Sequence, residues 1–347
     1  MVRSFRQALT CSSVFTVAAL CALSPAHADP IEDFYKGKTV SLIVSSSTGG
    51  GYDTLARLLT RFLPRHLPGQ PNIVVRNMPG AGGIVATNHL YTLAPKDGTV
   101  IGAVQNNTPF EPLFGTKEAQ YDPTKFNWLG SPSIETSILT IWHTSPVNTI
   151  QDAMKTELKM GSSGANSTPS FYGRLLNETL GTKLKLIVGY PGQNDALLAM
   201  ERGELDGYPS VFYNSLVSTR PSWLPEKKVK LLVQYGAEKL PQLPDVPFIL
   251  DLVKNEEDRQ LWRAAVGPIA TGRPYLLPPG VPADRVAAMR KAFWDAINDK
   301  EFLVEQAKAS LGADTPRTGE QIQDIIVQSY RSPPAVVERL KKLQQSQ

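Results

Sequence analysis

Cysteine is almost missing from this chain: of 347 residues, only Cys11 and Cys21 carry a thiol. Both lie in an N-terminal stretch that we expect to be removed from the mature protein. The remaining chain would then contain no cysteine, which excludes a disulfide framework and a thiolate metal site.

That N-terminal stretch has the three parts of a secretory signal peptide. Arg3 and Arg6 are followed by an apolar segment over residues 14–23, and Ala26-His27-Ala28 has the small-x-small form of a cleavage site. We expect cleavage after Ala28, so that residues 1–28 are the signal peptide and the mature chain is exported.

Long hydrophobic runs and a strong charge of either sign are lacking as well. Beyond the leader, no stretch approaches the roughly 20 apolar residues that a membrane-spanning helix needs, so we expect a soluble mature protein. The chain holds 36 Lys and Arg against 32 Asp and Glu. This near balance indicates no particular macromolecular partner, and we expect no nucleic acid among the partners.

Residues that carry catalysis or bind metals are sparse. After the leader the histidines are His66, His89 and His143, which lie far apart without ligand spacing. The glycine runs complete neither a dinucleotide-binding motif nor a P-loop. Gly161-Ser-Ser-Gly164 is not a nucleophile elbow, because Ala165 takes the place of the final glycine. We therefore expect no catalytic residue, no cofactor and no bound metal.

What the chain does have is a glycine-rich turn between an apolar run and an amphipathic segment. The run 40–44 suits a buried strand, 45–51 a polar turn, and the segment from Asp53 onward a helix. Such a turn directs backbone N–H groups at a helix N-terminus, where partial positive charge favours an anion. The alternative is a flexible turn in which Asp53 only caps the helix.

The same strand–turn–helix pattern recurs along the chain. Repeated βα units call for a parallel sheet with helices on its faces. A chain of this length also exceeds a typical single core, which favours two lobes. In the first lobe we expect strands over 40–44, 72–76 and 99–104, and in the second over 138–142, 158–161, 184–188 and 229–233.

The turns of both series share one composition. The windows 45–54, 105–109, 161–170 and 190–194 contain no Lys or Arg but are dense in Ser, Thr, Asn, Gln and Gly. An anion there would be held by neutral donors and helix N-termini, in part through water. Each Ser or Thr taken alone is explained as well by helix capping or turn formation, so the joint pattern carries the prediction.

A set of longer runs follows in one order: GKTVSLIVSSSTGGGYDTLARLL, VVRNMPGAGG, APKDGTVIG, GSSGANSTPSF, VGYPG, ERGELDGYPS and LPDVPF. Over nearly the whole mature chain they resemble the periplasmic solute receptors of tripartite tricarboxylate transport systems, the Bug family. The resemblance implies an α/β chain with the type II periplasmic binding protein fold, whose two lobes close on a ligand in the cleft between them. It also implies a location in the periplasm.

On this resemblance we expect residues 29–136 to form the N-terminal part of lobe 1 and residues 137–234 to form lobe 2. Residues 235–347 would be the mainly helical C-terminal part of lobe 1. The hinges would then lie near Ser137 and Gln234.

The resemblance places the ligand between loops of both lobes, where relatives hold a carboxylate through backbone amides, hydroxyls and bridging waters. For Asp53 and Asp206 two roles stay open, a contact with the ligand or a purely structural one. The expected ligand-binding residues are Ser46, Thr48, Gly50, Gly51, Tyr52, Asp53, Gln105, Asn106, Thr108, Ser162, Ser163, Asn166, Ser167, Thr168, Tyr190, Gly192 and Asp206.

One loop departs from the family pattern. Relatives carry prolines and an aromatic ring where this chain has Ser45-Ser46-Ser47-Thr48, and Tyr52 replaces a commoner small residue. Either the pocket is wider and wetter there, or Tyr52 folds back and forms the missing wall.

The expected function is therefore capture of a small organic acid and its delivery to integral membrane transporter subunits, by a monomer without catalysis. One alternative is a receptor that senses the acid for a signalling partner. Another is an exported hydrolase or lyase, which turnover of a bound carboxylate would identify.

Overall fold

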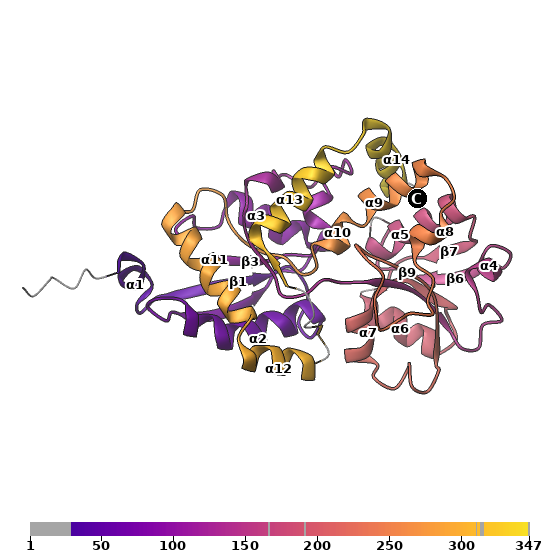
Figure 1. Ribbon diagram of the computed structural model, residues 1–347, viewed down its shortest axis with the longest axis horizontal. Helices are drawn as coiled ribbons and strands as arrows, with labels where there is room; N and C mark the ends of the chain where they lie inside the picture. Colours follow the sequence, from indigo (N-terminus) through magenta and orange to yellow (C-terminus); the bar gives the residue numbers. More distant parts are fainter. Residues whose placement is uncertain (1–28, 166, 191, 310, 313–315, 346–347) are drawn as a thin grey trace, which may run out of the picture.

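Two β-sheets, each with helices on both faces, lie side by side along the long axis of the molecule (Figure 1). The structure is a computed structural model, which describes residues 29–345 apart from 166, 191, 310 and 313–315. The expected α/β fold with two lobes is confirmed. Over the described residues, no helix combines the length and apolar character needed to cross a bilayer.

The first sheet has the strand order β11-β4-β10-β3-β1-β2. β1 runs parallel to both β2 and β3, as the repeated βα units predict. β10 and β11 run antiparallel to their neighbours, so the sheet is mixed rather than wholly parallel. Its strands are β1 Thr39–Val44, β2 Asn72–Asn77, β3 Val100–Ala103, β4 Asn127–Ser131, β10 Tyr275–Leu277 and β11 Arg317–Thr318.

The second sheet has the order β7-β6-β8-β5-β9. β6 runs parallel to β7 and β8, whereas β5 runs antiparallel to β8 and β9. Its strands are β5 Ser137–Trp142, β6 Leu158–Gly161, β7 Leu184–Ile187, β8 Gly207–Phe212 and β9 Val229–Tyr235.

Successive side chains of β1 point to opposite faces of the first sheet, so the strand contributes to two hydrophobic cores. Leu42 and Val44 pack with α2, α11 and α12, while Ile43 faces the core beneath α3 and α13. α2 buries Leu55, Leu59 and Phe62, a spacing that puts one apolar helical face on the sheet. The helices of this lobe are α1 Pro30–Tyr35, α2 Gly51–His66, α3 Ile84–Thr92, α11 Ala283–Ile297, α12 Lys300–Lys308 and α13 Gly319–Tyr330, with short 3₁₀ turns η1 Ala81–Gly83, η2 Thr108–Phe110 and η3 Pro123–Lys125.

The C-terminal part of the chain divides between the lobes, which corrects the expectation that all of 235–347 belongs to lobe 1. Trp262 stacks on Tyr172 of the second lobe, and the Tyr172 hydroxyl donates to Ala265 O. Arg339, in the last helix of the chain, forms an ion pair with Glu178 of the second lobe. Around the second sheet lie α4 Ile150–Ala153, α5 Thr168–Leu180, α6 Gln193–Glu201, α7 Tyr213–Thr219, α8 Ile249–Leu252, α9 Glu256–Ala265 and α14 Pro334–Gln345.

The chain crosses between the sheets after β4, over residues 132–136, and again over 266–274, which include α10 (Gly267–Ala270). It returns to the second lobe over residues 331–333, between α13 and α14. The expected hinge at Gln234 is wrong, because Gln234 lies inside β9 and its side chain amide donates to Leu243 O and Val246 O. The first two crossings touch, since Ser131 Oγ donates to Ser133 O and accepts from the Arg273 N–H.

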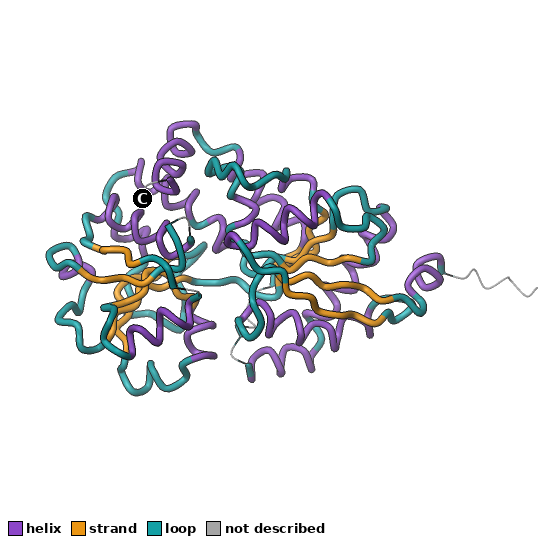
Figure 2. The backbone as a smooth tube through the Cα atoms, turned by 180° about the vertical axis from the view of Figure 1, so that it is seen from behind, coloured by secondary structure: helices purple, strands orange, loops and turns teal. Residues whose placement is uncertain are grey.

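The lobes share a core on one side only. A single hydrophobic cluster runs beneath α3 and α13 of the first lobe and α5, α9 and α14 of the second. On the opposite side the core is split, with one cluster under α2, α11 and α12 and another under α6 and α7. Loops and helix ends gather between the two sheets (Figure 2). Lobe movement would therefore pivot on the shared side.

Candidate functional site

Asp53 holds the glycine-rich loop together from inside. Its carboxylate is buried and accepts from Gly49 N, Arg57 Nε and Asn77 Nδ2, each at 2.9 Å. Burial acts to raise the pKa of Asp53, but the hydrogen bonds from Arg57, Gly49 and Asn77 outweigh it and keep the pKa below its ordinary value. Of the two roles left open for Asp53, these contacts support the structural one.

The loop itself is turned outward. Asn77 Nδ2 also donates to Ser46 O, and the exposed Thr48 hydroxyl donates to Asn77 Oδ1 at 3.3 Å. Gly50 is the N-cap of α2 and offers no side-chain cap, so the first amides of this 16-residue helix have no partner from the cap. Uncapped amides and the helix dipole make this end of α2 attractive to an anion.

A second loop, residues 105–108, closes over the start of α2. The Gln105 N–H donates to Ser45 Oγ at 2.8 Å, and the Asn106 N–H donates to the Tyr52 hydroxyl at 3.1 Å. Burial raises the pKa of Tyr52 far above its ordinary value, so the hydroxyl is neutral. Because the Tyr52 ring spans the gap between the loops, the geometry supports the view in which tyrosine forms the wall.

Among the described residues, three polar groups at these loops are buried without a partner: the donors Ser46 Oγ and Asn106 Nδ2, and the acceptor Asn107 Oδ1. Asn106 is 4% exposed, so its side chain is shielded from bulk solvent. Thr108 differs, because its buried hydroxyl donates to Gln105 O at 2.9 Å and fixes the turn. Ser46 Oγ and Asn106 Nδ2 are therefore the unpartnered donors that these loops offer to an anion, whereas Asn107 Oδ1 can only accept.

A cation also lies at the start of α2, although the sequence windows expected to hold the anion contain no Lys or Arg. The guanidinium of Arg273 lies against Gly51, where an added Cβ would come within 3.0 Å of Cζ. Its Nε donates to Glu135 at 2.7 Å, and both side chains are buried. Burial raises the pKa of Glu135, and the charge of Arg273 opposes that rise. The sequence signal for this pair is a lone cation inside the apolar stretch 265–281.

In the second lobe the serines satisfy one another. Ser162 Oγ lies 2.7 Å from Ser167 Oγ and 2.6 Å from Ser170 Oγ. All three hydroxyl oxygens also lie within hydrogen-bond distance of Gly164 O, at 3.2, 2.7 and 2.8 Å, so their hydrogens are shared among these contacts. These three serines, which we term the serine cluster, form a closed network around one carbonyl.

The remaining groups expected in lobe 2 are mostly backbone at helix starts. Ser167 caps α5 and Gly192 caps α6, and neither makes a side-chain cap bond. The Tyr190 N–H donates to Ser162 O at 3.2 Å, so the two loops adjoin. Ser163 is exposed, Thr168 is half-buried as the first residue of α5, and Asn166 lies outside the described residues.

Asp206 belongs to the sheet. Its carboxylate accepts from the Lys159 N–H at 2.7 Å, and its backbone bonds both Lys159 and Trp142. These contacts lie where β8 begins, while the serine cluster follows the end of β6. The structural role is the one that the contacts of Asp206 support.

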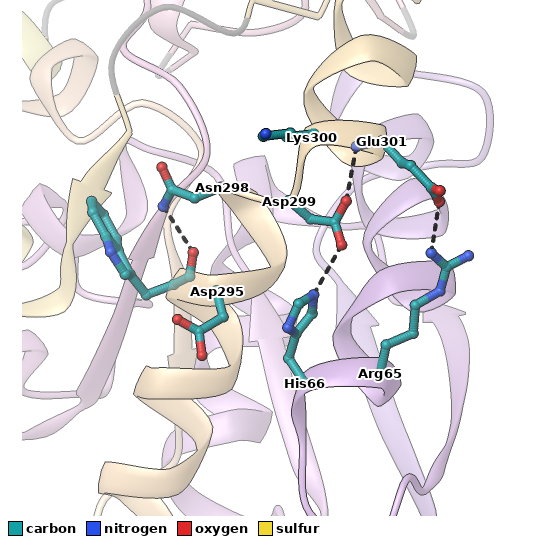
Figure 3. A pocket seen from close by; sticks show the side chains of 8 residues that line it. Arg65, His66, Asp295, Asn298, Asp299, Lys300 and Glu301 are labelled. Atoms are coloured by element: carbon teal, nitrogen blue, oxygen red, sulfur yellow. Dashed lines mark hydrogen bonds and ion pairs between the residues drawn. The ribbon is translucent and has the colours of Figure 1, made fainter.

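A hollow of about 640 Å³ lies elsewhere, at the C-terminal end of α2. Figure 3 shows His66 directed at Asp299 and Arg65 at Glu301, at 3.1 and 2.8 Å. The 16 residues of α2 separate this hollow from the glycine-rich loop by about 24 Å. These charged side chains are paired with each other, so we do not regard the hollow as the binding site.

Solved structures of periplasmic binding proteins have the same fold as this chain. MatC from Rhodopseudomonas palustris with bound malate has a TM-score of 0.66 at 23% identity, over 89% of this chain and 99% of that chain. Rpa4515 of R. palustris with adipate has a TM-score of 0.67 at 19% identity, over 88% and 97%. These likenesses show a two-lobed periplasmic binding protein fold.

Sequence comparison is more specific. The UPF0065 protein in the gbd 5' region of Cupriavidus necator is 27% identical over 247 residues, which cover 68% of this chain and 70% of the relative. The profile of the tripartite tricarboxylate transporter family receptor matches residues 55–331. This chain therefore belongs to the family of tripartite tricarboxylate transporter receptors, which are periplasmic solute-binding proteins.

Proposed function

We propose that the protein captures a small organic anion by a carboxylate at the start of α2 and delivers it to a membrane transporter. The observation that carries this proposal is the pair of buried, unpartnered groups, Ser46 Oγ and Asn106 Nδ2, beside an uncapped helix N-terminus. A buried polar group without a partner costs about 1–3 kcal/mol. A carboxylate would accept from both groups and from the first amides of α2, and would offset that cost.

Dicarboxylates are the first candidates. The structural neighbours hold malate and adipate, each of which carries two carboxylates. One carboxylate would sit at α2, and the other end of the molecule would face the helix starts at Ser167 and Gly192 in the second lobe. The proteins compared share the fold at low identity, so the choice among acids rests on experiment.

We propose no catalytic step. Asp53 is the carboxylate nearest to the site in sequence, and both of its oxygens already accept hydrogen bonds, from Gly49 and Arg57 on one side and Asn77 on the other. A general base needs a free lone pair within reach of the proton it removes. The protein would act as a monomer that releases the acid unchanged.

A thermal-shift screen of the mature protein tests the binding proposal. Malate, adipate and citrate should each be compared with the corresponding neutral amide at equal ionic strength. An acid present at 100 times its dissociation constant stabilises the folded state by about 2.7 kcal/mol. Stabilisation by at least one acid and by none of the amides is expected. Equal responses to acids and amides, or no response to any of them, would overturn the proposal.

Closure of the lobes is part of the proposal. The split core on the side of α2 and α7 leaves that side able to open, while the shared core holds the other side. Small-angle scattering should show a smaller radius of gyration when a stabilising acid is added. An unchanged profile at saturation would argue against closure but not against binding.

Export is proposed from residues 1–28, which lie outside the described part of the chain. The purified periplasmic protein should begin at Asp29, because Ala26 and Ala28 fit the small-x-small cleavage rule. Mass spectrometry of the intact protein checks the start. A mass that includes Met1, or a lipid on Cys21, would refute the assignment.

A further inference from the structure

Arg273 brings a positive charge to the start of α2 from the second crossing between the lobes. The side chain is 1% exposed. Its Nε donates to Glu135 Oε1 at 2.7 Å, and its Nη2 donates to Ser215 Oγ at 3.1 Å. Nη1 is buried and has no hydrogen-bond partner among the residues that the structure describes. One end of the guanidinium is therefore satisfied and the other is not.

The unsatisfied end faces the first residue of α2. An added Cβ on Gly51 would overlap Nη1 and come within 3.0 Å of Cζ and of Nη2. The ring of Tyr52 lies 5.5 Å from Cζ on the same side. Tyr52 also accepts from the Asn106 N–H, and Asn106 carries the unpartnered amide of the neighbouring loop. Nη1 and Asn106 Nδ2 are thus two unpartnered donors on residues that lie next to Tyr52.

The electrostatics of this arrangement call for an anion. The start of a helix carries partial positive charge, so a guanidinium placed there is repelled by the helix dipole. Glu135 neutralises Arg273, but it does so from the Nε side and leaves Nη1 against the helix. A buried guanidinium N–H without an acceptor is costly. A carboxylate between Nη1 and the α2 amides would remove both penalties at once.

We infer that Arg273 is a ligand-binding residue and that its Nη1 donates to the carboxylate held at the start of α2. The inference rests on the proposed function and makes it more specific, because it gives the site a charged anchor that selects carboxylates over their neutral amides. Ser215 belongs to α7 of the second lobe. The same guanidinium therefore connects the bound carboxylate to both lobes.

Arg273→Gln and Arg273→Lys test this directly, with malate and adipate as probes in calorimetric titration. Gln removes the charge and the free donor, so binding of whichever probe the wild type binds should weaken at least tenfold. Lys keeps the charge but not the fork of donors, and should retain more affinity than Gln. The unfolding temperature of each free variant is measured alongside, because Arg273 also partners Glu135.

A pair of glycine variants separates the ligand contact from the ion pair. Gly51→Ala keeps the charges of Arg273 and Glu135 but puts a methyl group where Nη1 lies, which forces that end of the guanidinium to move, so it should also weaken acid binding at least tenfold. Gly50→Ala is the matched change one residue earlier, where an added Cβ meets nothing nearer than Ser47 O at 4.0 Å. It should weaken binding by much less, since it only stiffens the loop.

Each outcome bears on the inference. Acid binding by Gly51→Ala within threefold of Gly50→Ala would overturn it, even if Arg273→Gln fails to fold. Wild-type affinity in Arg273→Gln would overturn it while leaving the proposed function intact. If no acid binds the wild type in preference to its amide, the proposed function fails and the role of Arg273 fails with it.

Discussion

Two polar loops, one from each lobe, satisfy their hydrogen-bonding groups in opposite ways. Beside α2 in the first lobe, Ser46 Oγ and Asn106 Nδ2 are buried without partners. In the second lobe, the hydroxyls of Ser162, Ser167 and Ser170 bond one another and Gly164 O. Unmet groups favour a ligand and cost stability in its absence, whereas a closed network stabilises its own loop. The first lobe should therefore set affinity for the acid, and the second should supply a preformed surface to close on it.

The largest expected effect comes from Asp53, whose carboxylate holds the first loop together. Asp53→Asn should lower the free energy of unfolding by roughly 2–3 kcal/mol at pH 7, because the buried carboxylate accepts from three donors. Urea unfolding measures this change. A loss below about 0.5 kcal/mol would show that the loop does not depend on this residue.

The contribution of Asp53 to stability should depend on pH. The folded pKa of Asp53 is lowered, so its contribution to stability is fully present above the unfolded pKa of about 3.9 and is lost as pH falls through the folded value. The difference in stability between wild type and Asp53→Asn should thus be constant near neutral pH and shrink below about pH 4. A difference that stays constant down to pH 2 would contradict the assignment.

Tyr52 should carry the next largest effect, on affinity. Tyr52→Thr removes the ring that spans the two loops and should weaken binding of a stabilising acid by roughly 1–3 kcal/mol. Ser46→Phe is the companion change and should sharply weaken acid binding by steric exclusion if the cleft is open beside Ser46. Greater damage from Ser46→Phe than from Tyr52→Thr would favour the wide, wet pocket over the tyrosine wall.

Asn106→Ala should cost affinity without costing stability. Its amide nitrogen has no partner in the free protein, so truncation removes a buried unsatisfied donor. Calorimetry should show weaker acid binding by about 1 kcal/mol or more, with an unfolding temperature equal to or above that of wild type. Lower stability together with unchanged affinity would reverse the role given to this residue.

Ser162→Ala should behave in the opposite manner and with the smallest effect. It removes the hydroxyl shared by Ser167 and Ser170, and should lower stability by about 1 kcal/mol. Affinity for the acid should change by less than threefold. Thermal unfolding and calorimetry on Asn106→Ala and Ser162→Ala together form a crossed test of the comparison.

Local sequence patterns were enough to predict the strand and the helix that flank the glycine-rich turn. The apolar run 40–44 predicts β1, and the helical spacing of apolar residues after Asp53 predicts α2. They could not give the partners of Arg273, because Glu135 lies 138 residues away. Nor could they place α9 and α14, whose apolar faces show burial but not against which lobe. Ser46 and Ser162 both lie in turns rich in serine and glycine, so the sequence does not distinguish them. Only the structure shows that the hydroxyl of Ser46 is unpartnered and that of Ser162 is hydrogen-bonded.

A crystal structure with a stabilising dicarboxylate such as malate or adipate tests the central claim most directly. A carboxylate oxygen should lie about 3 Å from Asn106 Nδ2 and within hydrogen-bond reach of the first amides of α2. The serine cluster should keep its present hydrogen bonds. An acid bound by the hydroxyls of Ser162 and Ser170, with Asn106 Nδ2 still unpartnered, would contradict the account.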